Sequence, residues 1–556
     1  MHLAIVAAAA MSPSAGRMPA AVPVSALALS FSCRKRPRCC SMARHACTHV
    51  RRAASSSPVD DSAGSSSSSS SSGAGVPSYY ERIGRPRTVL APMVAQSDLP
   101  FRLLCRRYGA ELAYTQMIHA QNYGRSADFR SNHLDVYAPA QSIGGADVLS
   151  GSQMNCLDGL GREFGPGGLD SYRDRMIGRE EGFTEDHASF VNPVSPITYP
   201  EEGPVVVQLA GHDPTLVADA ALDIVERTLG NVAGIDLNGG CPQKIASKGR
   251  YGAFLHEEEP ELYCSVLAQM RRVLPPSVGV SAKIRLPVDA TQLRDRIERI
   301  IDTGVDLITV HGRTLRENKT KVRGADWDAI ALAAQIAREY SGNSDFPIVA
   351  NGGIEYGSDV RRCLDRTGAS AAMSSESLLE NPALFATAGP YAVDDTELTP
   401  RQLFDRQLSL VDEYLDLCAV YPPVPGSLGR VGGSYNVVRS HVFKMTYRYL
   451  EERPDIRTKL ASSSVVSIPA TRKIVAELRA SYEGLRDAEW EGCKSGQVGA
   501  SWYRRHRDGA TRVHRRGGHA SNAGSLSEIS SIEEKKRIMK ERLRKLKELK
   551  EKRIVV

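Results

Sequence analysis

Short apolar runs alternate with amphipathic segments through the middle of the chain. The run VVVQLA at residues 205–210 is apolar at nearly every position, which is typical of a parallel strand covered on both faces. The segments between such runs look helical, so the pattern predicts alternating strands and helices in βα units. The predicted strands cover residues 89–94, 112–118, 205–210, 234–238, 280–286, 307–312, 347–353 and 371–376.

The number of predicted strands indicates how the sheet is arranged. Eight parallel strands are the number that closes a (β/α)8 TIM barrel, whereas a doubly wound open sheet would spread the strand ends along a crevice. We therefore predict an α/β fold with a TIM barrel over residues 79–390. The helices of this barrel are predicted at residues 98–108, 214–228, 259–274, 291–303, 326–340 and 358–367.

The alternation is interrupted once and then ends. Residues 138–203 are rich in Gly, Asp, Ser and Pro, and we interpret them as an insertion, in the most cautious view a disordered surface segment. After residue 382, segments with helical periodicity predict a small all-helical domain over 391–485. These helices are predicted at 399–421, 437–450 and 471–484, with disorder at 486–530 and a highly charged helix at 531–556.

The N-terminal extension has a composition of its own. Residues 1–58 contain no Asp or Glu and are rich in Arg, Ser and Ala, which is typical of an organelle transit peptide. We expect delivery to a chloroplast or mitochondrion; the alternative is an extension without an address, on a protein of the cytoplasm or nucleus. A serine run at 65–72 predicts a disordered linker, which completes a segment over 1–78.

Charge and cysteine content narrow the class of protein. The net charge of +7 suits a polyanionic partner, although many solvated surfaces share such an excess. No apolar run has the length of a membrane span. The 11 cysteines show no paired spacing typical of zinc ligands, so we predict free thiols in a reducing compartment and no metal site.

Polar residues recur where the predicted strands end. Cys241 follows one strand directly, and Pro242 prevents that strand from continuing. Taken alone, Cys241 is equally consistent with a small apolar residue in the core. Burying amides and ammonium groups is unfavourable unless each has a partner, so a ligand shared at the barrel mouth would explain the pattern. The residues concerned include Gln208, Asn238, Cys241, Lys283, Arg285, His311, Arg313 and Asn351.

Two of the strand ends suggest a phosphate site. Asn351, Gly352 and Gly353 are the last residues of the seventh predicted strand, and Ser375 and Glu376 are the last of the eighth. TIM barrels commonly bind phosphate through backbone N–H groups at these two positions, and glycine lets the backbone approach an anion closely. The pattern therefore predicts a phosphorylated cofactor, whose ring would be lined by Gln208, Lys283 and His311.

Several of these stretches together resemble the tRNA-dihydrouridine synthases. The resemblance covers roughly residues 89–385 and the helical domain behind them, and its most specific element is the Asn-x-Gly-Cys-Pro run around Cys241. Residues 115–120 and 374–376 are similar to the eukaryotic branch that acts on uridines 16 and 17 of the tRNA D-loop. The stretches are Ala91-Pro92-Met93, Leu237-Asn238-Gly239-Gly240-Cys241-Pro242, Lys283-Ile284-Arg285, Val310-His311-Gly312-Arg313 and Ala350-Asn351-Gly352-Gly353.

The resemblance implies an FMN enzyme, reduced by transiently bound NADPH or NADH, that saturates the C5–C6 bond of a tRNA uridine. Hydride would go from the reduced flavin to C6, and Cys241 would give a proton to C5. No glycine fingerprint of a Rossmann site is present for the nicotinamide cofactor. Asn238 would contact the uracil edge, while Arg285 would reach the uracil or pair with a strand-end carboxylate.

The resemblance also implies which residues hold the flavin. Lys283 and His311 would lie near N1 and O2 of its ring, where negative charge grows on reduction. The ring would pack on Pro92, Met93 and Val94. The phosphate and ribityl tail would be held by Asn351, Gly352, Gly353, Ser375 and Glu376, with Glu376 acting through its backbone.

Basic residues near the predicted mouth are candidates for contacts with RNA. Lys244, Lys248 and Arg250 follow Cys241, and a second group (Arg316, Lys319, Lys321 and Arg323) follows His311; Arg313 would also contact the substrate. A solvated face is the alternative for each group. No stable protein partner is predicted. The competing functions are a flavin barrel that oxidises or reduces a free pyrimidine or dihydroorotate, and an RNA-binding barrel without catalysis.

Overall fold

The computed structural model describes residues 77–136, 203–228, 230–318, 321–421, 423 and 433–493. The predictions of a transit peptide, a serine-rich linker and a charged C-terminal helix concern residues outside this set. So does nearly all of the predicted insertion at 138–203. In the parts of the chain that are described, no helix is long and apolar enough to cross a membrane.

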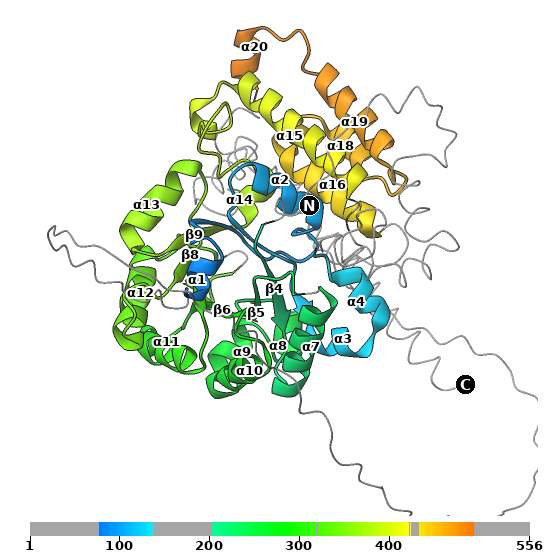
Figure 1. The fold of residues 1–556 in the computed structure, drawn as a ribbon. Helices are drawn as coiled ribbons and strands as arrows, with labels where there is room; N and C mark the ends of the chain where they lie inside the picture. Colours follow the sequence, from blue (N-terminus) through cyan, green and yellow to red (C-terminus); the bar gives the residue numbers. More distant parts are fainter. Residues whose placement is uncertain are drawn as a thin grey trace, which may run out of the picture. The chain divides into compact units, whose positions relative to one another are not determined.

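The strands form a closed parallel barrel (Figure 1), which confirms the predicted fold. Strand β1 pairs with β2 and β9, and β2 pairs with β4, so the ring closes. Strand β3 continues β2 after a break, because both pair with β4 and the ring therefore has eight positions. The strands are β1 (Thr88–Leu90), β2 (Leu112–Tyr114), β3 (Ile118–His119), β4 (Val205–Ala210), β5 (Gly234–Gly239), β6 (Gly279–Leu286), β7 (Leu307–Thr314), β8 (Ile348–Asn351) and β9 (Ala371–Ser374).

Helices follow the strands and cover the outside of the barrel (Figure 1). Strand β5 is followed by three of them, of which the short α8 comes directly after the Cys241 loop. The barrel helices are α2 (Leu99–Arg107), α3 (Ala120–Arg125), α4 (Ala127–His133), α7 (Pro214–Arg227), α8 (Lys244–Lys248), α9 (Ala253–Glu258), α10 (Pro260–Val273), α11 (Leu293–Asp302), α12 (Trp327–Ser341), α13 (Gly357–Thr367) and α14 (Glu376–Glu380).

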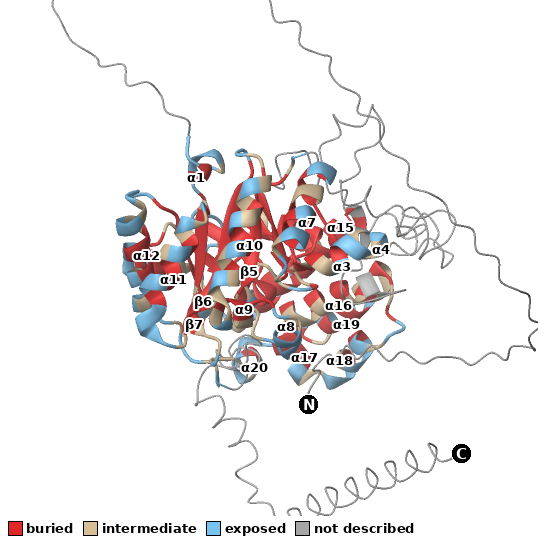
Figure 2. Cartoon of the chain, turned by 90° about the horizontal axis from the view of Figure 1, so that it is seen from below, coloured by how far each residue is buried: buried red, intermediate tan, exposed pale blue. Residues whose placement is uncertain are grey.

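A short helix closes the amino end of the barrel. Helix α1 (Tyr79–Arg82) buries Tyr79 against the first residues of β5 and β6, which are glycines. A Cβ atom on Gly279 would lie 2.2 Å from the Tyr79 ring, so only glycine leaves room for it. In Figure 2, α1 lies beyond one end of the strands, whereas α8 lies toward the opposite end.

A helical region follows the barrel in the chain, as predicted. Helix α15 packs on α2, where Phe101 and Tyr414 make an edge-to-face contact with ring centroids 6.4 Å apart. The predicted helix at 437–450 is broken at Thr446. The region consists of α15 (Pro400–Val420), α16 (Gly433–Met445), α17 (Tyr447–Glu452), α18 (Pro454–Ala461), α19 (Ile468–Ala480) and α20 (Asp487–Gly492).

Candidate active site

The strand register brings the predicted site residues together at the carboxyl rim of the barrel. Asn238 on β5 is paired with Lys283 on β6, and Arg285 on β6 is paired with His311 on β7. His311 is in turn paired with Asn351 on β8. Four consecutive strands therefore deliver amide, ammonium, guanidinium and imidazole groups to one sector of the rim.

Asn238 is held by hydrogen bonds on both sides of its carboxamide. Its Oδ1 accepts from the backbone N–H groups of Gly240 (3.1 Å) and Cys241 (3.0 Å), and its Nδ2 donates to Gln208 Oε1 (2.7 Å). Gln208 Nε2 donates to Asp236 Oδ2 at 2.8 Å. In the structure Asn238 thus shapes the loop of Cys241, and the predicted contact with uracil remains a prediction.

Asp236 is a site residue that our sequence reasoning missed. It is fully buried, and it accepts a second hydrogen bond from Ser281 Oγ at 2.7 Å. Burial raises its pKa to about 7, against the hydrogen bonds and the nearby ammonium of Lys283, which lower it. The signal was available in the sequence, because an acidic residue between Ile235 and Leu237 interrupts an otherwise apolar strand.

Cys241 is half-buried, in the loop between β5 and α8. Its carbonyl accepts from Ala253 N–H at 3.1 Å. The backbone passes so close at Gly252 (φ +69°) that a Cβ there would lie 2.9 Å from the Cβ of Cys241. Burial raises the pKa of the thiol, with opposing effects from the Gln243 backbone and Arg285. The thiol therefore carries its proton at neutral pH and can donate it.

Lys283 is buried beside the amide of Asn351. Its Nζ donates to Asn351 Oδ1 at 2.9 Å, while Asn351 Nδ2 donates to the Met373 carbonyl at 3.0 Å. Burial lowers the pKa of Lys283 to about 8, and the charge of Arg285 adds to this effect while Asp236 opposes it. The ammonium is therefore cationic at neutral pH but close to losing its proton.

Two arginines hold the rim between β6 and β7. Arg285 donates from Nε to the Gly240 carbonyl (2.8 Å) and from Nη1 to the Thr314 carbonyl (3.0 Å). These hydrogen bonds go to the backbone, and not to a strand-end carboxylate, which was one of the two partners considered for Arg285 from the sequence. Arg313 Nη1 lies 3.1 Å from His311 Nε2. Because a guanidinium only donates, a hydrogen bond in this contact runs from Arg313 to Nε2 of His311.

The predicted phosphate segments lie at the ends of β8 and β9. Strand β8 stops at Asn351 because Gly352 and Gly353 have φ angles of +99° and +84°. A Cβ on Gly352 would lie 3.0 Å from the His311 ring, so the backbone runs close to the imidazole. Ser375 and Glu376 lie at the junction between β9 and α14.

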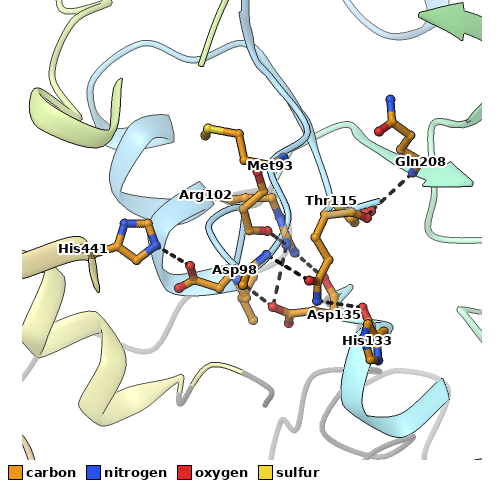
Figure 3. A network of polar contacts seen from close by, with 12 residues as sticks. Met93, Asp98, Arg102, Thr115, His133, Asp135, Gln208 and His441 are labelled. Carbon is orange, nitrogen blue, oxygen red and sulfur yellow. Dashed lines mark hydrogen bonds and ion pairs between the residues drawn. The ribbon is translucent and has the colours of Figure 1, made fainter. Parts of the chain in front are cut away.

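The predicted flavin-packing residues Pro92, Met93 and Val94 lie in the loop between β1 and α2. Met93 N–H donates to Ser97 Oγ, and the Ser97 hydroxyl donates to the Ala91 carbonyl, both at 2.9 Å. Figure 3 shows this polar network, which runs from His441 of the helical region through Asp98 to the neighbourhood of Thr115 and Gln208. The loop is therefore tied to its own strand and to α16.

The basic residues after Cys241 differ in what they contact. Lys244 and Lys248 are exposed on α8. Arg250 instead pairs with Glu259, with Nε 3.1 Å from Oε1. In the second group Arg316, Lys321 and Arg323 are exposed, and Lys319 lies outside the described residues. Arg313 is buried, with its Nε donating to the Arg323 carbonyl at 2.7 Å.

A closed parallel barrel with a protonated thiol, an ammonium and an imidazole at its carboxyl rim defines the class of the protein: a TIM-barrel enzyme with its site at the usual end. Comparison with known proteins identifies the family. The chain matches the family described as "Dihydrouridine synthase (Dus)" over residues 89–139 and 162–419. This match skips residues 140–161, which lie within the predicted insertion.

Individual relatives agree with this result. A tRNA-dihydrouridine(16/17) synthase of Schizosaccharomyces pombe is 30% identical over 69% of this chain and 75% of its own length. A tRNA-dihydrouridine(16/17) synthase-like protein of Rattus norvegicus is 30% identical over 73% and 70%. A tRNA-dihydrouridine(20a/20b) synthase-like protein of Mus musculus is 31% identical over 54% and 68%. The chain therefore belongs to the dihydrouridine synthase family and is an oxidoreductase.

Proposed function

We propose that this protein reduces uridine to 5,6-dihydrouridine in the D-loop of tRNA, with FMN as cofactor and NADPH or NADH as reductant. The observation that carries the proposal is that Cys241, Lys283 and His311 come from the neighbouring strands β5, β6 and β7 and the loop after β5, at the carboxyl rim of a barrel of this family. The names of the relatives, which include tRNA, dihydrouridine and NAD(P)(+), support the substrate and the reductant.

The rim residues fit a flavin with a phosphate tail. Arg313 Nη2 is buried and has no hydrogen-bond partner among the described residues, so it offers a donor to a carbonyl or an anion. Lys283 offers positive charge to the pyrimidine side of the ring, and Gly352 and Gly353 carry the chain away from the end of β8 with positive φ angles. Bound FMN, once reduced by NAD(P)H, would supply the hydride for C6 of the uracil.

Cys241 would complete the reduction by giving its proton to C5. An ordinary thiol has a pKa of about 8.5, and burial raises that of Cys241, so the donor form dominates at neutral pH. The hydrogen bonds of Asn238 to the Cys241 loop would keep the thiol at the mouth. The uridine would have to leave its stack in the tRNA to reach the thiol, as in other enzymes that act on bases.

The choice of uridine is inferred from the relatives. The 16/17 synthases match over about 70% of this chain, whereas the 20a/20b relative matches over 54%. The longer match supports uridines 16 and 17 as the targets. Lys244 and Lys248 are exposed on α8, which follows the Cys241 loop, and in this proposal they would contact phosphates of the tRNA backbone.

We also propose an organelle as the site of action, because residues 1–58 combine many arginines with a complete absence of acidic residues. A fusion of residues 1–78 to a fluorescent protein tests this proposal. Import into chloroplasts or mitochondria is expected, and diffuse cytosolic or nuclear fluorescence would contradict it.

Replacement of Cys241 tests the proposed chemistry directly. In Cys241→Ala we expect bound FMN and its reduction by NADPH to persist, while dihydrouridine formation falls by a factor of about 10²–10⁴, the usual contribution of a general acid. Cys264→Ala is the matched control, because Cys264 lies on α10 outside the barrel mouth and should be dispensable. Mass spectrometry of the tRNA product measures dihydrouridine formation by both variants.

Full dihydrouridine formation by Cys241→Ala would contradict the assignment of the proton donor. Turnover of free uracil or dihydroorotate without tRNA would favour a small-molecule oxidoreductase instead. A colourless protein that binds tRNA and leaves it unchanged would favour the non-catalytic alternative.

A further inference from the structure

A chain of buried side chains links the barrel interior to the backbone of Cys241. Asp236 and Asn238 are two residues apart on β5 and therefore point to the same face of the strand. Gln208, on the neighbouring strand β4, bridges them through the 2.8 Å and 2.7 Å hydrogen bonds described above. Each of the three side chains is at least nine-tenths buried.

The hydrogen bonds in this chain have a fixed direction. The backbone N–H groups of Gly240 and Cys241 can only donate, so Asn238 must present Oδ1 to them and Nδ2 to Gln208. Gln208 must then present Oε1 to Asn238 and Nε2 to residue 236. The carboxyl group of Asp236 accepts at this last position, and above its pKa of about 7 it is an ionised carboxylate that can only accept.

We infer that Asp236 is a positioning residue for the reaction: it terminates a directional relay through Gln208 and Asn238 that holds the Cys241 backbone in its active arrangement. The inference rests on the proposed function, because that function makes Cys241 the proton donor. Asp236 is not among the residues proposed to contact the flavin or the uracil, so its role in the reaction would be indirect.

The direction of the relay predicts which substitutions are tolerated. Asp236→Asn still offers an oxygen to Gln208 and an amide to the Ser281 hydroxyl, so its effect should be small. Asn238→Asp keeps the acceptor for Gly240 and Cys241 but removes the donor to Gln208. At a pH where both carboxyl groups are ionised, Gln208 then faces a carboxylate on both sides and cannot satisfy both, because one of its ends is an oxygen.

Combining the two substitutions restores a consistent set of hydrogen bonds. In Asp236→Asn/Asn238→Asp the carboxylate has moved from one end of the relay to the other. Gln208 can rotate its amide by half a turn, donate to residue 238 and accept from residue 236. The second substitution should therefore rescue the first, which independent sites would not do.

The reactivity of the Cys241 thiol measures this rescue. The full-length protein is alkylated with iodoacetamide across a range of pH, and the Cys241 peptide is quantified by mass spectrometry. The plateau rate at high pH reports access to the thiolate, whereas the inflection reports its pKa. We expect Asn238→Asp to raise the plateau about tenfold, because its carboxylate is repelled by the oxygen of Gln208 and its displacement weakens the two backbone hydrogen bonds that it accepts. Asp236→Asn and the double variant should stay within about twofold of the wild type.

Ser281→Ala provides the matched control, because it removes the other hydrogen bond of Asp236 and leaves the carboxylate in place. Ser281→Ala/Asn238→Asp should remain as reactive as Asn238→Asp. Equal plateau rates in Asn238→Asp and in the Asp236→Asn/Asn238→Asp double variant would overturn the proposal, as would an equal rescue by Ser281→Ala.

If Asn238→Asp is recovered only as insoluble protein, solubility replaces alkylation as the readout. A soluble double variant with a cooperative melting transition then supports the relay, and an insoluble one overturns it. Alkylation needs neither tRNA nor flavin. The relay can therefore fail while the wild type forms dihydrouridine, and dihydrouridine formation can fail while the rescue is observed.

Discussion

Lys283 shows how burial sets the chemistry of a single residue in this barrel. Its ammonium is enclosed at the end of β6, hydrogen-bonded to Asn351, and burial lowers its pKa to about 8. A lysine with a lowered pKa loses its proton as the pH rises through that value. The positive charge that we propose for the flavin site is therefore present at neutral pH and disappears in mildly alkaline solution.

This residue predicts a pH dependence of cofactor affinity. We expect the dissociation constant of FMN, measured by fluorescence titration of the apoprotein, to rise about tenfold as the pH increases from about 7 to about 9.5, since an ion pair of this kind is worth about 1–2 kcal/mol. Lys283→Met should bind FMN weakly at all of these pH values. A wild-type affinity that does not change with pH, or a parallel change in Lys283→Met, would contradict the assignment.

For individual residues, the sequence predicted where the site residues lie on the strands better than it predicted their hydrogen-bond partners. Polar residues at strand ends could be identified because parallel strands all end at one rim, and the register brings Asn238, Lys283 and His311 to neighbouring positions there. The partners could not be predicted. The pairing of Arg250 with Glu259 depends on how the chain turns after α8, which no local pattern specifies.

Among the elements, α16 has a role that its sequence does not reveal. Its His441 donates from Nε2 to Asp98 Oδ1 at 2.6 Å (Figure 3). Tyr414 of α15 donates to Asp98 Oδ2 at 3.1 Å. Burial lowers the pKa of His441 although Asp98 opposes this. The helical region therefore holds Asp98 in place through two hydrogen bonds. The neighbouring residue Ser97 accepts a hydrogen bond from Met93 N–H and so fixes the loop of Met93.

Removing the hydrogen bond between His441 and Asp98 should lower both the stability of the fold and the affinity for FMN. His441→Phe keeps the stacking on Phe101 but leaves the buried Asp98 carboxylate short of a donor, with an expected loss of about 3 kcal/mol in unfolding free energy. FMN affinity should fall with it, because the loop of Met93 loses its support. Urea denaturation and fluorescence titration measure the two effects.

His441→Gln is the control, since its amide can still donate to Asp98. It should recover most of the stability and the FMN affinity. If the Phe and Gln variants behave alike, the hydrogen bond to Asp98 does not support the loop.

The elements themselves were predictable where a strong periodic pattern existed. The range predicted for β4 matches the structure, because five of its six residues are apolar and turn residues bound it on both sides. Strand β1 is shorter than predicted and ends at Leu90, just before the loop of Pro92. The short α18 and α20 were missed, because helices of eight and six residues carry too little periodicity to be recognised.

In the barrel as a whole, the packing contact of Tyr79 lies at one end of the strands, and the candidate active site lies at the other. Tyr79 of α1 closes the amino end against Gly234 and Gly279, while Cys241 and Lys283 lie at the carboxyl end. The same division is general in TIM barrels. Changes at the Tyr79 contact should therefore affect folding without altering the reaction.

Gly279→Ala tests this division of labour. The new methyl group would lie 2.2 Å from the Tyr79 ring, so we expect a loss of about 1–3 kcal/mol from overpacking, with kcat and KM for tRNA unchanged. Gly124→Ala is the control, because nothing lies within 4 Å of its added Cβ and α3 should tolerate it. A fall in kcat for Gly279→Ala at temperatures where it stays folded would show that the two ends are coupled.

We propose that this protein makes dihydrouridine at positions 16 and 17 of tRNA through Cys241. Cells that lack the protein provide the test, when dihydrouridine is mapped at each position in their organelle and cytosolic tRNA. We predict that dihydrouridine disappears at 16 and 17, in organelle tRNA if the N-terminal extension directs import, and returns with the wild type but not with Cys241→Ala. Unchanged dihydrouridine at both positions in every tRNA pool, or its loss at other positions alone, would contradict the account.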